Sequence, residues 1–185
     1  MQLRIGGLTN IGLLPTTLLI ASIALGASPP HPTEPPPEEA ERESLRGLNG
    51  VEVRVEPLDS QIEQRGLSEG KIEQDIRQRL QKAGVKVLTE RERLATPAAV
   101  LLIVRVETTH DRIGRFFYST DLLCAQRVKL ATPGAPEVSA VIWKRLGVIS
   151  TVADDNVKHL ADQVLRKVDQ FIKDYLAVNP DIRKP

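Results

Sequence analysis

The stretch that most constrains the fold is residues 99–108, AVLLIVRVET, near the middle of the chain. Its first half is apolar at every position, so both faces of an extended strand would be apolar there. Such a strand belongs in the centre of a sheet, with helices covering at least one of its faces. We therefore expect the other elements of the chain to be arranged around this strand.

A strand, a helix and a second strand precede this segment. Polar and apolar residues alternate over residues 51–56, which predicts a strand with one buried face. Ser68 suits the N-cap of a helix that ends at Gly84. A short strand at 85–88 and a charged turn at 89–94 follow, and a unit of this kind predicts a right-handed crossover with parallel strands. The apolar stripe of the helix consists of Ile72, Ile76, Leu80 and Ala83.

Two further strands and a long helix are expected after the central strand. Alternation predicts strands at 116–130 and 138–149, joined by a proline- and glycine-containing turn at 132–136. An apolar stripe at helical spacing predicts a helix over 154–178. The expected fold class is α+β with the order β-α-β-β-β-β-α. We expect a mixed sheet of about five strands, with two helices packed mainly on one face.

The N-terminal residues have the pattern of an export signal. Residues 1–27 combine a short segment that has Arg4 and no acidic residue with an apolar stretch that ends in small residues. We interpret them as a signal peptide, or as a signal anchor if they stay uncleaved, in which case the chain would contact the inner membrane. Residues 28–44 are rich in proline and glutamate and predict an extended linker. A single domain then spans 45–180, followed by a tail at 181–185, in a periplasmic or secreted protein.

Composition excludes several functional classes. The chain has 25 Lys and Arg against 24 Asp and Glu, so its charge does not favour binding to nucleic acid. Cys124 is the single cysteine, which excludes an internal disulfide and a site with several cysteine ligands. It shares the apolar parity of Leu122, so we expect it in the core as a small apolar residue. His159 lies off the main apolar stripe of the last helix and is interpreted as a solvated or helix-flank residue. The sequence has no nucleophile elbow, zinc motif or glycine-rich phosphate loop, and we expect no metal, no cofactor and no catalytic residues.

One loop has a composition suited to binding. Residues 108–117, TTHDRIGRFF, contain His110, Asp111, Arg112 and Arg115. A His-Asp pair can orient an imidazole for base catalysis, and arginines bind carboxylate or phosphate groups bidentately. The alternative is a polar hairpin loop whose aromatic residues enter the core. Trp143 shares strand parity with Val141 and Arg145, so it is a candidate reporter of the sheet face opposite the helices. An exposed Trp143 would support a ligand site there, and a buried one would leave that hypothesis without motivation.

Two segments resemble known exported proteins. GLSEGKIEQDIRQRLQKAGVKVLTERE and FIKDYLAVNP are similar to a group of uncharacterised exported bacterial domains, over residues 45–180. The expected order of elements also resembles the N-terminal domain of the Tol-Pal protein TolB and related folds of outer-membrane assembly and lipoprotein regulators. The resemblance implies a small periplasmic α+β domain and assigns no activity to any residue.

Three functional hypotheses follow. The first is a non-catalytic exported interaction module whose partner is an envelope protein or peptide bound at a strand edge or at the loop 108–117. The second is a small-ligand-binding protein that uses the sheet face opposite the helices. The third is an unrecognised hydrolase that uses His110 and Asp111.

Overall fold

The computed structural model describes residues 37–112, 116–152 and 158–180, and the structural statements below concern these residues. They belong to one compact unit of the chain. The strands are β1 (Val51–Val55), β2 (Val87–Leu88), β3 (Val100–His110), β4 (Phe116–Lys129), β5 (Glu137–Arg145) and β6 (Ser150–Val152). The helices are α1 (Pro37–Glu43), α2 (Ser60–Gln64), α3 (Glu69–Lys82), α4 (Glu90–Ala95) and α5 (Lys158–Val178).

The strands form one mixed sheet in the order β2-β1-β3-β4-β5, with β6 also paired to β4. The strands β2 and β3 both lie parallel to β1, whereas β4 is antiparallel to β3, β5 and β6. The predicted α+β class is therefore confirmed, and the apolar segment at 99–108 supplies the central strand β3, as expected. Parallel pairing of β1 and β2 around α3 is the crossover that the sequence predicts.

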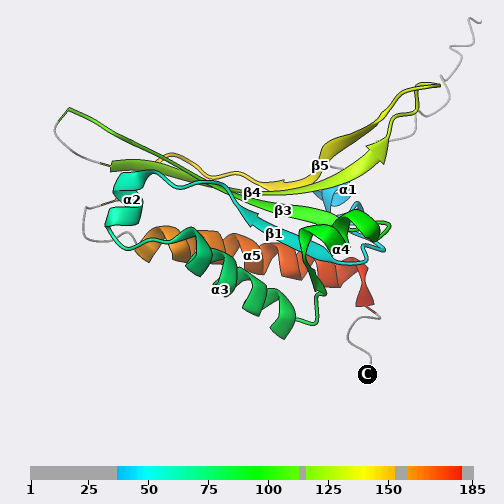
Figure 1. Ribbon diagram of the computed structural model, residues 1–185, viewed down its shortest axis with the longest axis horizontal. Helices are drawn as coiled ribbons and strands as arrows, with labels where there is room; N and C mark the ends of the chain where they lie inside the picture. The colour runs from blue at the N-terminus through cyan, green and yellow to red at the C-terminus, as the bar shows by residue number, and fades with distance from the viewer. Residues whose placement is uncertain (1–36, 113–115, 153–157, 181–185) are drawn as a thin grey trace, which may run out of the picture. The chain divides into compact units, whose positions relative to one another are not determined.

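Helices α3 and α5 cover the same face of the sheet (Figure 1). An ion pair between Arg79 of α3 and Asp169 of α5 joins the two helices. Trp143, Tyr175 and Phe171 are the bulkiest fully buried side chains, and they belong to the core between the sheet and α5. Burial of this one face is the main source of stability in such a two-layer fold.

Three helices are shorter, and two of them depart from the predicted elements. Residues 89–94, expected as a turn, form α4, because Thr89 and Glu92 make a complete capping box. The described end of the linker, expected as extended chain, is the helix α1, which has glutamates in its first turn. Asp59 caps α2 within residues 58–66, whose polar sequence is typical of a connecting loop with a turn of helix, so this short helix agrees with the sequence. The predicted helix start at 154–157 lies outside the described residues.

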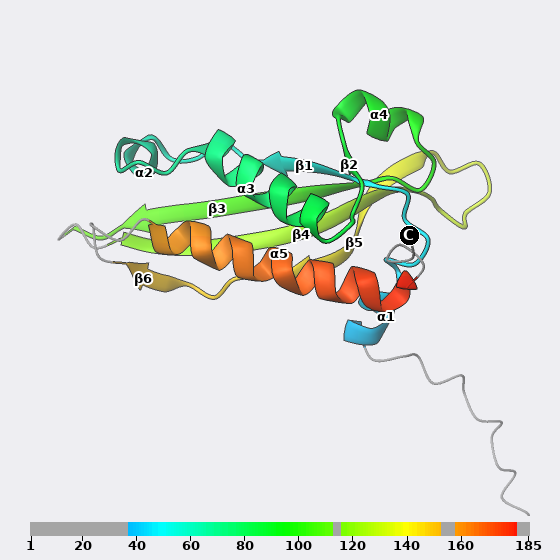
Figure 2. The same ribbon diagram turned by 90° about the horizontal axis from the view of Figure 1, so that it is seen from below.

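The single strand predicted over 138–149 is wrong in its last four residues. Strand β5 ends at Arg145, and β6 begins at Ser150 on the same side of β4 (Figure 2). Between them, four residues at 146–149 face three residues of β4. Gly147 allows this, because a Cβ atom there would lie 2.6 Å from the backbone oxygen of Thr120.

No described helix is both long enough and apolar enough to cross a membrane.

Candidate docking surface

The residues singled out in the loop 108–117 lie at the tip of the β3–β4 hairpin. His110 is exposed at the end of β3, opposite Phe116 of β4. Asp111 is half-buried and Arg112 is exposed, whereas Arg115 lies outside the described residues. Strand β3 thus extends two residues beyond its predicted end at 108, whereas β4 begins at 116 as predicted. Within the described ranges, no three His, Cys, Asp or Glu side chains group as metal ligands would.

Trp143 does not lie on the sheet face where the sequence predicts it. Cys124 pairs with Trp143 and Ala125 pairs with Val141, so Ile142 is an extra residue in β5. This extra residue reverses the face of the sheet toward which the later side chains of β5 point. Trp143 is fully buried and Val141 is 51 % exposed. The hypothesis of a ligand site marked by an exposed tryptophan loses its motivation.

Trp143 instead belongs to a polar network that joins α1, β5 and α5. Its indole nitrogen donates to Asp174 at 3.0 Å, and its ring meets Phe171 edge-on at 5.2 Å. The Arg145 guanidinium lies 4.5 Å from the centre of the indole and bonds to both Asp174 and Glu41. A cation held over an aromatic ring and between two carboxylates is well stabilised. The network attaches α1 to the sheet.

The sheet face opposite α3 and α5 carries an aliphatic stripe. Leu101, Ile103 and Leu123 are half-buried there and do not belong to the main core, and Val141 extends the stripe to the edge strand. The register of β3 and β4 places these side chains on the same face, because Leu101 pairs with Ala125 and Ile103 pairs with Leu123. We call the part of the sheet that carries these four side chains the uncovered face.

Polar contacts border the uncovered face. Arg105 bonds to Glu56 at 2.8 Å across β1 and β3, and this bond lowers the pKa of the Glu56 carboxyl. At the β2 end, Arg93 of α4 pairs with the buried Glu52. The carbonyl of Leu94 in α4 also accepts from a side chain of β4. Within the described chain, α4 is the helix that reaches this face, and it covers one end.

A second apolar surface lies at residues 146–149, which we call the apolar bulge. Leu146, Val148 and Ile149 are 58 %, 82 % and 78 % exposed. Two polar groups hold its backbone. The Gly147 N–H donates to the Asp121 carboxylate at 2.8 Å, and the Leu146 carbonyl accepts from the Lys167 ammonium at 3.1 Å. Burial lowers the pKa of this ammonium.

A small hollow lies beside the apolar bulge at the hairpin end of the sheet. Its volume is about 180 Å³, and it is lined from β3, β4 and the bulge. This volume is below the range of about 300–1,000 Å³ that is typical of small-molecule sites. The hollow is large enough for one apolar side chain of a partner. The lining residues are Glu107, Thr108, Thr109, Phe117, Tyr118, Ser119 and Ile149.

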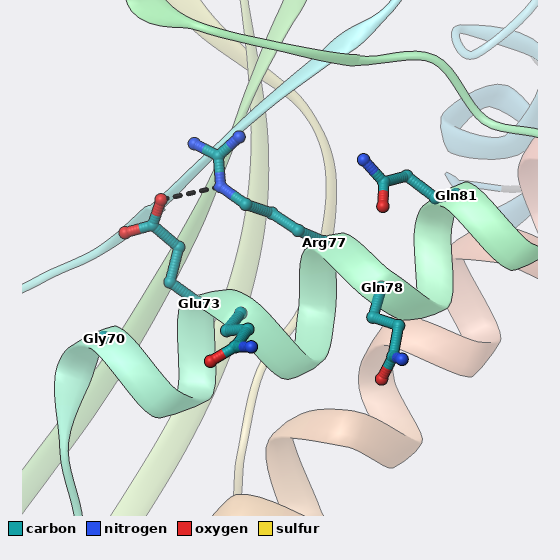
Figure 3. A pocket seen from close by; sticks show the side chains of 6 residues that line it. Gly70, Glu73, Arg77, Gln78 and Gln81 are labelled. Atoms are coloured by element: carbon teal, nitrogen blue, oxygen red, sulfur yellow. Dashed lines mark hydrogen bonds and ion pairs between the residues drawn. The ribbon is translucent and has the colours of Figure 1, made fainter.

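A larger, open hollow of about 600 Å³ lies on the outer side of α3 (Figure 3). Its charged residues, Glu73 and Arg77, bond to each other at 2.7 Å. The labelled glutamines Gln78 and Gln81 point apart in Figure 3. Because its charges are paired and its amides do not converge, this surface has the character of a solvated helix face.

Sequence reasoning placed two other residues well. Cys124 is fully buried in β4, as its position on the apolar parity predicts. His159 is half-buried at the start of α5, with its ring edge-on to Tyr118 and a contact to Gln163. The apolar bulge, by contrast, was not predicted from the sequence. The signal available was the interruption of alternation at Gly147 within LGVI, where a strand with one buried face would place polar residues.

Comparison with known proteins adds no family. No protein-family model matches the chain, and a search of curated proteins finds no match.

Proposed function

We propose that the chain is a non-catalytic exported binding module that docks an envelope protein or peptide on its uncovered face. The observation that carries this proposal is the aliphatic stripe formed by Leu101, Ile103, Leu123 and Val141. Aliphatic side chains on a sheet face that no long helix covers favour a partner that buries them. The export pattern of residues 1–27 supports an envelope location for that partner.

The surface has the layout of a protein interface. Its aliphatic centre is bordered by the Arg105–Glu56 pair on one side and by the contacts of α4 at one end. An apolar centre with a polar rim is the usual organisation of protein contacts. The hollow of about 180 Å³ further along the sheet adds a socket for a single side chain. An envelope protein or peptide is therefore favoured over a small molecule.

The alternative of a hydrolase has less support in the arrangement of side chains. His110 and Asp111 lie at an exposed hairpin tip, and Trp143 lies in the core. A catalytic base acts on a substrate held beside it, and the hollow at this end of the sheet holds about 180 Å³, below the size typical of small-molecule sites. Assays against esters, phosphoesters and glycans with the wild-type chain and His110→Ala decide this alternative. An activity that His110→Ala abolishes would replace our proposal.

Site-specific cross-linking in envelope extracts tests the proposed docking. A photo-reactive residue at position 141 should cross-link a defined protein or peptide, because Val141 lies on the uncovered face. The matched control places the same residue at Leu130, which is similarly exposed, at 46 %, in the β4–β5 hairpin. Val141→Glu should remove the partner in co-purification, whereas Leu130→Glu should retain it. Equal cross-linking from both positions, or none from 141, contradicts the proposal.

A further inference from the structure

The apolar bulge holds the three most exposed large aliphatic side chains of the described chain. We propose that Leu146, Val148 and Ile149 insert into the surface of an anionic lipid bilayer and hold this edge of the sheet against it. The apolar bulge adjoins the hollow through Ile149 but lies outside the aliphatic stripe of the uncovered face. The vesicles used to test it contain no protein, so failure of this proposal is distinguishable from failure of the proposed docking.

Two backbone groups of the apolar bulge bond to side chains of the domain. A peptide group that approaches lipid needs an internal hydrogen-bond partner, because the hydrocarbon offers none. The Gly147 N–H has this partner in Asp121, and the Leu146 carbonyl has it in Lys167. Asp121 belongs to β4 and Lys167 belongs to α5, so both partners are part of the folded domain. The bulge thus presents carbon outward while these two backbone groups bond inward.

Basic side chains flank the apolar bulge. Lys144 precedes it in β5, and Lys167 bonds to its backbone. Arg166 precedes Lys167 in α5. Among the described residues these three make no ion pair. Lys144 and Arg166 are exposed, whereas the Lys167 ammonium is held by the bulge itself. Long exposed basic side chains beside inserted carbon place their charges at the headgroups, which favours anionic over zwitterionic lipid.

The dimensions of the apolar bulge favour lipid over protein. A stable protein contact buries about 800 Å² on each partner. Four residues at a sheet edge form a narrow row, whereas insertion into a bilayer surface needs only a few exposed aliphatic side chains beside basic ones.

The short link between α1 and the N-terminal apolar stretch also favours contact with lipid. Glu41 of α1 bonds to Arg145, the residue that precedes the bulge. Nine residues, 28–36, separate the apolar stretch 11–27 from α1 and span at most about 35 Å. If that stretch stays in a membrane, the chain keeps the bulge near lipid, and tethering allows a weak contact to persist.

A fluorescent label at the bulge tests insertion directly in the full chain. Val148→Cys, labelled with an environment-sensitive dye, should show a blue shift and a several-fold increase in emission with vesicles of phosphatidylglycerol and phosphatidylethanolamine. Phosphatidylcholine vesicles should give little change. Cys124 is fully buried and does not compete for the label. The matched control is Leu130→Cys, labelled in the same way, which should stay in water with both kinds of vesicle.

A charge reversal tests the role of the basic residues. Lys144→Glu in the labelled Val148→Cys chain should weaken the response to anionic vesicles by roughly tenfold at low salt. Lys82→Glu, at the end of α3, is the control and should change it by less than about twofold. An unchanged label at 148, equal responses at 148 and 130, or no effect of Lys144→Glu overturns the proposal. A response at 148 to envelope proteins but not to protein-free vesicles overturns it in favour of a protein contact.

Discussion

The indole N–H of Trp143 bonds to the carboxylate of Asp174 at 3.0 Å and ties the edge strand β5 to the last helix, α5. The indole is also fully buried against Phe171. Trp143→Phe should therefore lose the hydrogen bond and leave a small cavity, at a cost of about 2 kcal/mol in the free energy of unfolding. Denaturant titration followed by circular dichroism measures this loss. Val141→Ala, on the other face of the same strand, is the control and should cost less than about 1 kcal/mol.

Gly147 is the residue that permits the apolar bulge. Gly147→Ala should destabilise the fold by roughly 2 kcal/mol, because the new Cβ would lie 2.6 Å from backbone that cannot move aside easily. Gly70→Ala in α3 meets nothing closer than 3.8 Å and should stabilise the chain by up to about 1 kcal/mol. Thermal melts of the two variants measure their shifts in melting temperature relative to wild type. Equal shifts in the melting temperature would contradict the close approach at Gly147.

Cys124 should be chemically inert in the folded chain. Burial raises the pKa of its thiol, and the side chain has no exposed area. Since the thiolate is the reactive form, an aromatic disulfide reagent at neutral pH should label the chain only after unfolding. The rate of labelling, measured across a denaturant series, should follow the unfolded fraction. Rapid stoichiometric labelling of the native chain would show that β4 is not buried as described.

The Arg105–Glu56 pair should make part of the stability depend on pH. Its hydrogen bond lowers the pKa of Glu56 below the ordinary value of 4.5, so the folded chain holds this proton less tightly than the unfolded chain. The stabilising contribution is complete above the ordinary value and is lost as pH falls through the lowered one. Because both side chains are partly exposed, the contribution is modest.

Glu56→Gln checks this contribution. The difference in unfolding free energy between wild type and variant should be largest near neutral pH and should vanish in strong acid. Glu137→Gln removes an exposed carboxylate at the start of β5 and serves as the control. A difference for Glu56→Gln that stays constant from neutral to strongly acidic pH would exclude the lowered pKa.

The capping box of α4 should be worth a measurable amount. Thr89→Ala removes the hydroxyl that accepts from the Glu92 N–H and donates to the Glu92 carboxylate. It leaves the bond from the backbone N–H of residue 89, so the cost should be about 1 kcal/mol. Thr132→Ala, in the exposed turn between β4 and β5, should be close to neutral. Hydrogen exchange should also show faster opening of residues 90–95 in Thr89→Ala. No change in either measurement would mean that α4 is held mainly by Arg93 and Glu52.

Local pattern was sufficient for most elements. The helix α3 follows from Ser68 and an apolar repeat every three to four residues, and β3 follows from an uninterrupted apolar run. The capping box at Thr89 and Glu92 was also legible in the residues, although the segment was interpreted as a turn. These signals are available because capping and periodicity depend on neighbours within a few residues.

The surfaces proposed for docking depend on contacts between strands. Trp143 and Val141 have the same parity in the sequence, and only the extra residue Ile142, opposite β4, places them on opposite faces. In the same way, LGVI becomes an exposed bulge because Gly147 meets the backbone of Thr120. The extra residue at 142 leaves no local pattern. The broken alternation at Gly147 marks a position without showing which way its neighbours point, since a bulge is defined by pairing with the partner strand.

The sequence by itself therefore determined the α+β class, the central strand, the long helices and the burial of Cys124, all of which rest on periodicity and composition. The tertiary structure decided which face Trp143 occupies, where the last long strand breaks and which aliphatic side chains stay outside the core. The reason is physical. Side-chain direction in a sheet reverses with a single inserted residue, and only pairing with the neighbouring strand shows where that residue lies.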